Sequence, residues 1–110
     1  MARSKKRNIG SDLVRSLCDY LALKKHFYWR SNNVGVYDVA RGFHRKLPFG
    51  SMKGVPDIIV LKDGKFIGIE AKAGSGRLSP DQAEFGRLCI KNGGEYILAR
   101  SIDDLVAVGL

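Results

Sequence analysis

Three charged residues stand out in the segment 54–76, GVPDIIVLKDGKFIGIEAKAGSG, because each interrupts or closes an apolar run. They are Asp57, Glu70 and Lys72. A carboxylate among apolar side chains is costly without a partner, and two carboxylates held side by side repel each other unless a cation lies between them. Carboxylate oxygens suit Mg²⁺ or Mn²⁺. The pattern therefore favours a divalent metal site with a lysine beside it.

A β-hairpin is predicted to bring these side chains together. Two β-branched runs, DIIVLK and KFIGIEAK, are joined by Asp63-Gly64, a strong hairpin signal because a type I′ turn needs positive φ at both central residues. With a two-residue turn, counting outward along the ladder places Asp57 directly opposite Glu70. Directly opposed residues share a face of the sheet, and the period of two places Lys72 on that face as well.

Each of these residues also has an ordinary interpretation. Asp57 alone is typical of a loop or strand-edge carboxylate, and Glu70 with Lys72 alone is typical of a solvated pair. Glu70, however, lies late in an apolar strand whose two faces both look buried, so its charge needs a partner. The combined pattern therefore favours a functional site.

The motif resembles the PD-(D/E)xK signature of metal-dependent nucleases. The strings GVPDIIV, GIEAK and LSPDQAEF are similar to the VRR-NUC branch of that superfamily, over about residues 11–105. The resemblance implies phosphodiester hydrolysis on a restriction-endonuclease-like core. It implies that Asp57, Glu70 and the Ala71 carbonyl hold Mg²⁺, or Mn²⁺ in its place, and that Lys72 positions or stabilises the attacking hydroxide.

Gln82 has two interpretations. In SPDQ, Ser79 is a predicted N-cap, Pro80 the first helical residue and Gln82 the third residue of a capping box. Gln82 also shares a helical face with Phe85 and Cys89, whose apolar side chains must face the sheet. Its amide could therefore point at the site, as the glutamine of the family motif does, to orient water or phosphate.

The first helix departs from the family pattern. Relatives carry a glutamate at its start that reaches the metal, and the corresponding register falls on Gly10. Asp12 is the nearest acid, and it lies off the apolar face formed by Leu13, Leu17 and Leu21, so we expect it to point away from the site. Water is then expected to take that coordination position.

Composition points to a polyanionic partner. The 110 residues and 12.2 kDa allow one small domain, and the formal charge of +8 with a pI near 9.8 favours binding to nucleic acid. No apolar run approaches the roughly 20 residues that span a bilayer, so we expect a cytoplasmic protein that does not enter a membrane. Cys18 and Cys89 are too few for a disulfide framework and are expected to be buried thiols.

Several basic residues are candidates for DNA contact. Residues 1–8 form a predicted flexible basic arm that precedes the nuclease-like domain, 9–110. In FYWRSNN, alternation places Arg30 and Asn32 on one face, where they are expected to reach a phosphate near the metal. The irregular segment 33–56 is expected to contact the DNA backbone through Arg41, Arg45, Lys46 and Lys53.

The predicted fold is α/β, a small mixed sheet flanked by helices. Helical spacing predicts a helix over 11–26, and aromatic residues predict a strand over 27–33. The hairpin follows, then a helix over 80–92, a strand over 95–99 and a short helix from residue 102. The last strand-helix-strand unit predicts a parallel crossover.

The predicted function is that of a Mg²⁺-dependent DNA endonuclease. Because 110 residues with one site cut one strand per encounter, we expect a homodimer that prefers branched DNA such as a Holliday junction. The alternatives are a nucleic-acid-binding module without catalysis, a structural subunit that assembles through its apolar sheet, and a monomer that nicks any duplex. A binding module or a structural subunit would gain nothing from the buried charged trio.

Overall fold

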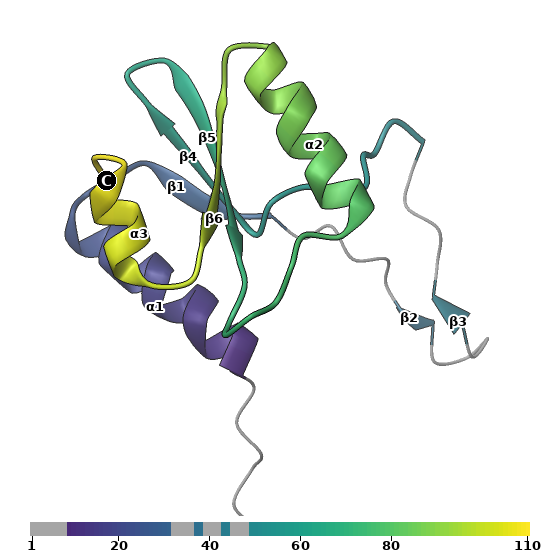
Figure 1. The fold of residues 1–110 in the computed structure, drawn as a ribbon, viewed down its shortest axis with the longest axis horizontal. Coiled ribbons are helices and arrows are strands. Elements are labelled where there is room, and N and C mark those ends of the chain that lie inside the picture. Colours follow the sequence, from purple (N-terminus) through teal and green to yellow (C-terminus); the bar gives the residue numbers. More distant parts are fainter. Residues whose placement is uncertain (1–8, 32–36, 39–42, 45–48) are drawn as a thin grey trace, which may run out of the picture.

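The structure is a computed structural model that describes residues 9–31, 37–38, 43–44 and 49–110. Its centre is a four-stranded mixed sheet in the order β1-β4-β5-β6 (Figure 1). The sheet strands are β1 (Tyr28–Arg30), β4 (Ile58–Lys62), β5 (Lys65–Ala71) and β6 (Glu95–Ala99). Strand β4 runs antiparallel to its neighbours β1 and β5, and β6 runs parallel to β5. The predicted α/β fold with a mixed sheet is therefore confirmed.

Three helices cover the sheet. They are α1 (Ile9–Leu23), α2 (Pro80–Lys91) and α3 (Ile102–Ala107). Helices α1 and α3 lie together on one side of the sheet, and α2 lies on the other (Figure 1). Helix α2 connects β5 to β6, as the predicted crossover requires.

The main core lies between the sheet and helices α1 and α3. It joins one face of the hairpin to the apolar stripe of α1 and to Leu105 of α3. The α1 stripe consists of Val14, Leu17, Cys18 and Leu21, and the hairpin contributes Ile58, Val60, Ile67 and Ile69. Side chains alternate across a strand, so the intervening residues of the hairpin, including Glu70, face α2.

The hairpin has the predicted register. Lys62 pairs with Lys65 and Ile58 with Ile69, and both turn residues have positive φ, 51° at Asp63 and 77° at Gly64. Continued one residue past the start of β4, this register places Asp57 across from Glu70. The two-residue turn therefore determines which residues of the two strands meet.

Some predicted boundaries were wrong. Helix α1 begins at residue 9 and ends at residue 23, whereas 11–26 was predicted. It ends early because Lys25 has a φ of 60°, and His26 and Lys25 donate backbone hydrogen bonds to Leu21 and Ala22, as in a Schellman motif. Within the described residues, the strand predicted over 27–33 forms as β1 over residues 28–30; residues 32 and 33 lie outside them.

A second, two-stranded sheet was not predicted. Strands β2 (Tyr37–Asp38) and β3 (Phe43–His44) pair antiparallel within a segment whose sequence shows no strand periodicity.

Among the described helices, none is long and apolar enough to cross a membrane.

Candidate active site

The predicted catalytic and metal-binding residues line one cavity at the end of the sheet where β5 stops and β4 starts. The cavity has a volume of about 370 Å³. Strands β4 and β5 place the carboxylates and the lysine there, the first turn of α2 adds the glutamine, and the first turns of α1 form another wall. The lining residues are Gly10, Ser11, Val14, Arg30, Asp57, Glu70, Ala71, Lys72 and Gln82.

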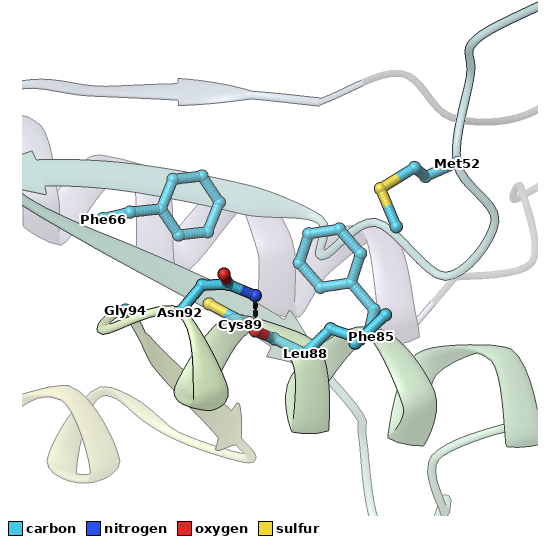
Figure 2. A pocket seen from close by; sticks show the side chains of 7 residues that line it. All are labelled: Met52, Phe66, Phe85, Leu88, Cys89, Asn92 and Gly94. Atoms are coloured by element: carbon cyan, nitrogen blue, oxygen red, sulfur yellow. Dashed lines mark hydrogen bonds between the residues drawn. The ribbon is translucent and has the colours of Figure 1, made fainter.

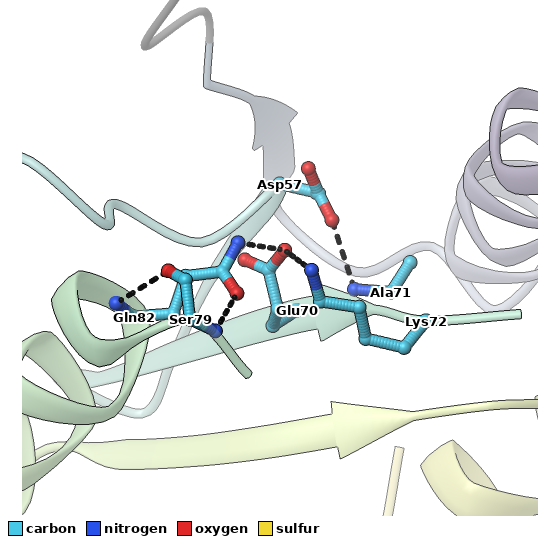
Figure 3. A network of polar contacts seen from close by, with 6 residues as sticks. All are labelled: Asp57, Glu70, Ala71, Lys72, Ser79 and Gln82. Carbon is cyan, nitrogen blue, oxygen red and sulfur yellow. Dashed lines mark hydrogen bonds and ion pairs between the residues drawn. The ribbon is translucent and has the colours of Figure 1, made fainter. Parts of the chain in front are cut away.

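Asp57 is held across the end of the hairpin. The backbone N–H of Ala71 donates to Oδ2 of Asp57 at 2.9 Å (Figure 3). On the other side, the N–H of Ser31 donates to the Asp57 carbonyl at 3.0 Å, and the Ser31 hydroxyl donates to the carbonyl of Pro56. The peptide that carries Asp57 is thus fixed by strands on both sides.

Glu70 is the most deeply buried charged residue of the site, at 3% exposure. Its Oε1 accepts a hydrogen bond from Nε2 of Gln82 at 3.0 Å and lies 3.9 Å from Nζ of Lys72 (Figure 3). Its Oε2 is buried and has no hydrogen-bond partner among the described residues. A buried oxygen without a partner is costly, so a proton or a cation bound to Oε2 would stabilise this carboxyl group.

The environment of Glu70 favours its neutral form. Burial raises the pKa of Glu70, the nearby Asp57 raises it further, and Lys72 opposes them, so that the pKa reaches about 8. At neutral pH and without a cation, Glu70 therefore carries a proton. A bound cation would reverse this preference because it favours the ionised carboxylate.

The oxygen donors of the site suit a hard divalent ion, although the protein supplies few of them. The described residues contain no cluster of three or more His, Cys, Asp or Glu side chains that could hold a metal. Asp57 and Glu70 supply two carboxylates. An extended residue directs its N–H and its carbonyl to the same strand edge, so the Ala71 carbonyl is directed to the edge on which Asp57 lies. Two carboxylates, a carbonyl and water fit Mg²⁺, which keeps several waters when bound.

Gln82 fulfils both of its predicted interpretations. Its backbone N–H donates to the Ser79 hydroxyl at 3.2 Å, and its Oε1 accepts from the Ser79 N–H at 2.8 Å, which completes the capping box. The same amide uses its Nε2 to reach Glu70. The helix cap therefore orients the side chain for the site.

Gly54 holds the first turn of α2 close to this network, a role that the sequence did not reveal. It has a φ of 76°, and a Cβ at this position would lie 2.2 Å from the Asp81 carbonyl oxygen and 2.7 Å from the Gln82 nitrogen. Only glycine allows such an approach. Gly54 is the first residue of the string GVPDIIV, and the structure indicates that it allows the close position of Gln82.

The start of α1 agrees with the expected departure from the family pattern. Gly10 lines the cavity, as its register predicted, whereas the exposed Asp12 does not. Ser11 also lines the cavity. No signal in the sequence had identified Ser11, because a serine at a helix start is common.

The predicted DNA-contacting residues are only partly described. Arg30 lines the cavity together with the carboxylates. Lys53 is exposed and does not line it. Asn32, Arg41, Arg45, Lys46 and the arm 1–8 lie outside the described residues.

A second hollow lies against the same helix, α2, and has a different character. Its volume is about 340 Å³ (Figure 2), and its walls carry no acidic or basic side chain. It is lined by Met52, Phe66, Phe85, Leu88, Cys89, Asn92 and Gly94. Burial raises the pKa of the Cys89 thiol, which donates to the Glu95 carbonyl at 3.4 Å, so this hollow offers no reactive nucleophile.

Fold and site together define a small α/β protein with paired carboxylates and a lysine at the end of a mixed sheet, the arrangement predicted from the two-residue turn of the hairpin. No protein-family model and no curated protein matches the sequence. One similar solved structure is described as "VRR_NUC domain"; it is 14% identical, with a TM-score of 0.64, and the match covers 93% of this chain and 95% of that one.

Another similar structure, described as "VRR_NUC domain protein", is 19% identical, with a TM-score of 0.68 and coverage of 94% of this chain and 87% of that one. The chain has the fold of VRR_NUC domains. The resemblance predicted from the sequence is therefore confirmed for the fold.

Proposed function

We propose that this protein is a Mg²⁺-dependent DNA endonuclease that hydrolyses phosphodiester bonds and also accepts Mn²⁺. The observation that carries the proposal is the convergence of Asp57, Glu70, Lys72 and Gln82 on one cavity within a VRR_NUC fold. The cavity is open to solvent and polar, and Arg30 forms part of its wall. A phosphate group is the natural ligand of such a surface.

The metal would be held by Asp57, Glu70 and the Ala71 carbonyl. When bound, Mg²⁺ supplies a Lewis acid that withdraws charge from a phosphate oxygen and lowers the pKa of water. The Oε2 atom of Glu70 has no hydrogen-bond partner among the described residues, which supports a cation bound at this atom. Asp57 is already oriented by the Ala71 N–H, so little rearrangement is required of it.

Lys72 and Gln82 would act on the reacting groups. The Lys72 side chain is 24% exposed and its ammonium lies 3.9 Å from Glu70 Oε1, so it reaches the cavity while its charge remains near the carboxylates. There it would stabilise negative charge that develops during attack on phosphorus. Gln82 would hold Glu70 in place through Nε2 and help orient water or phosphate.

Replacement of Lys72 tests the chemical assignment. Lys72→Ala should lower cleavage by about 100-fold or more, the size of effect seen when one group that stabilises transition-state charge is removed. DNA affinity should change only a few-fold, because one charge among nineteen basic residues adds little to phosphate binding. Lys91→Ala removes an equal charge from the exposed end of α2 and serves as the matched control. Undiminished turnover in Lys72→Ala would disprove the assignment of the reaction to Lys72 and this cavity.

The preferred DNA and the assembly are finer parts of the proposal. We propose a homodimer that prefers branched DNA, because one chain offers one site and a two-fold pair offers two, on twice the charge of +8. Cleavage of linear, flapped, single-stranded and four-way DNA, with and without Mg²⁺, tests the substrate. Light scattering tests the assembly: a 12.2 kDa particle without junction preference would refute this part and leave the chemistry intact.

A further inference from the structure

We infer that the exposed aromatic pair Phe27 and Trp29 is a stacking surface for unpaired DNA bases beside the candidate active site. Phe27 is 65% exposed and Trp29 is 42% exposed. Their ring centroids lie 5.6 Å apart, with 50° between the ring planes. Apolar side chains exposed side by side, unlike ones scattered singly, mark an interaction surface.

The pair lies on the face of the sheet that carries the carboxylates. Trp29 pairs with Ile59, and directly opposed residues share a face; Asp57 lies two residues before Ile59 and therefore on the same face. Tyr28, between the two rings, packs against the α1 core on the opposite face. Strand β1 is the edge of the four-stranded sheet (Figure 1), so no further strand of that sheet lies beyond the rings.

The spacing between Trp29 and the site fits a nucleic-acid strand. One strand spacing and two residues separate Trp29 from Asp57, which corresponds to about 8 Å between their Cα atoms. Stacked nucleotides advance by about 3.4 Å each along one strand. A base on Trp29 would therefore belong to a nucleotide about two positions from the scissile phosphate.

Neighbouring residues supply contacts for the phosphates. Arg30 directly follows Trp29 but pairs with Ile58, so it begins on the opposite face of the sheet, and its side chain lines the active-site cavity at the end of the sheet. Strand β1 therefore offers a ring for a base and, at the cavity, a cation for the backbone. Sequence-tolerant recognition of single strands combines these two elements, since every base has a π face.

The charge around the pair favours nucleic acid over a second copy of this chain. Residues 20–31 contain no acidic side chain, and Lys24, Lys25 and Arg30 are exposed there. A second copy would bring a further +8 to a surface that is already basic, and like charges placed together are unfavourable. Single-stranded DNA brings both the stacking partners for the rings and a negative charge that Lys24, Lys25 and Arg30 can bind.

The inference rests on the proposed DNA cleavage for its biological meaning, but binding without metal tests it separately. Trp29 is the only tryptophan of the chain, so intrinsic fluorescence reports directly on its ring. The native protein, in a chelator to prevent cleavage, is titrated with a short single-stranded oligothymidine and with an abasic oligodeoxynucleotide of equal length and charge. We expect fluorescence quenching and about 5-fold or tighter binding only with the oligothymidine, as one stacked base provides.

Variants assign the effect to the ring. Trp29→Ala should bind both oligonucleotides equally in fluorescence anisotropy with labelled DNA, and Trp29→Phe should retain part of the preference. Ile90→Ala removes an apolar side chain from α2 that is 61% exposed, more than Trp29 at 42%, and should leave the preference intact. Thermal melts test whether each variant is folded. If Trp29→Ala does not fold, Trp29→Phe still provides the test.

Equal binding of the two oligonucleotides by the native protein would overturn the inference, as would unchanged Trp29 fluorescence. Light scattering that shows a dimer for the native chain and a monomer for Trp29→Ala, with no preference for bases, would assign the surface to contact between copies instead. If bases are preferred but Mg²⁺ supports no cleavage, the inference stands and the proposed nuclease function fails. If DNA is cleaved without a preference for bases, the inference fails alone.

Discussion

The raised pKa of Glu70 makes a quantitative prediction about the metal-free protein. Replacement of Glu70 by glutamine removes the ionisable group and keeps its shape. The remaining oxygen can still accept from Nε2 of Gln82, as Glu70 Oε1 does at 3.0 Å. We therefore expect Glu70→Gln to fold and to differ from the native protein mainly in how its stability responds to pH.

The direction in which stability changes with pH follows from the pKa of Glu70 in the folded and unfolded states. An unperturbed glutamate carboxyl has a pKa of about 4.5, and burial beside Asp57 raises the pKa of Glu70 to about 8 in the folded protein. Between these pH values the native state binds more protons than the unfolded state, so the free energy of unfolding falls as pH rises. The loss begins near the lower value and is nearly complete above the higher one.

The magnitude is large for a chain of this size. One pKa unit corresponds to about 1.36 kcal/mol, so the native protein should lose about 3 kcal/mol of stability between about pH 5 and pH 8 through this group alone. Glu70→Gln should lack that loss. It should be close to the native protein in stability at the lower pH and clearly more stable at the higher pH.

Urea unfolding at both pH values, in a chelator and at one protein concentration, measures the difference. Glu95→Gln is the matched control, because Glu95 is exposed and pairs with Lys65 at 3.1 Å, away from the cavity. It should show the native pH dependence. Mg²⁺ should restore the stability of the native protein at the higher pH, because a ligand that binds only the folded state stabilises it.

An unchanged pH dependence in Glu70→Gln would refute the reasoning. It would mean that Glu70 is ionised in the folded protein without a metal, and therefore that water or a rearranged Lys72 satisfies its second oxygen. A steeper dependence in the variant would refute it equally, because the variant has lost the group to which the slope is assigned.

Other predictions follow from the same network. Asp57→Asn should abolish the rise in melting temperature that Mg²⁺ or Mn²⁺ gives the native protein, and calorimetry that still detects native-like metal binding would contradict the assigned ligand. Gly54→Ala should lower cleavage by about 10-fold or more, because its Cβ would meet Asp81 at 2.2 Å and displace Gln82. In a Gln82→Ala background the same change should cost little more, whereas full additivity would show that Gly54 acts elsewhere. DNA affinity should fall steeply as salt rises, and a flat response would contradict a binding surface made of basic residues.

The sequence by itself determined the hairpin and its register. Asp63-Gly64 specifies a two-residue turn, and once that turn is known, simple counting places Asp57 across from Glu70 and Lys72 on the same face. Ser79 and Pro80 likewise specify where α2 begins. These features depend on residues close together in the chain, so local backbone geometry is enough to predict them.

Only the tertiary structure decided how the separate elements meet. The hydrogen bond from Gln82 to Glu70 depends on how closely α2 approaches the sheet, and Gly54 permits that approach through contacts with residues 27 or more positions away. The placement of Arg30 in the cavity wall also depends on packing. The high pKa of Glu70 arises first from burial, and burial is a property of the assembled layers that no short stretch of sequence contains.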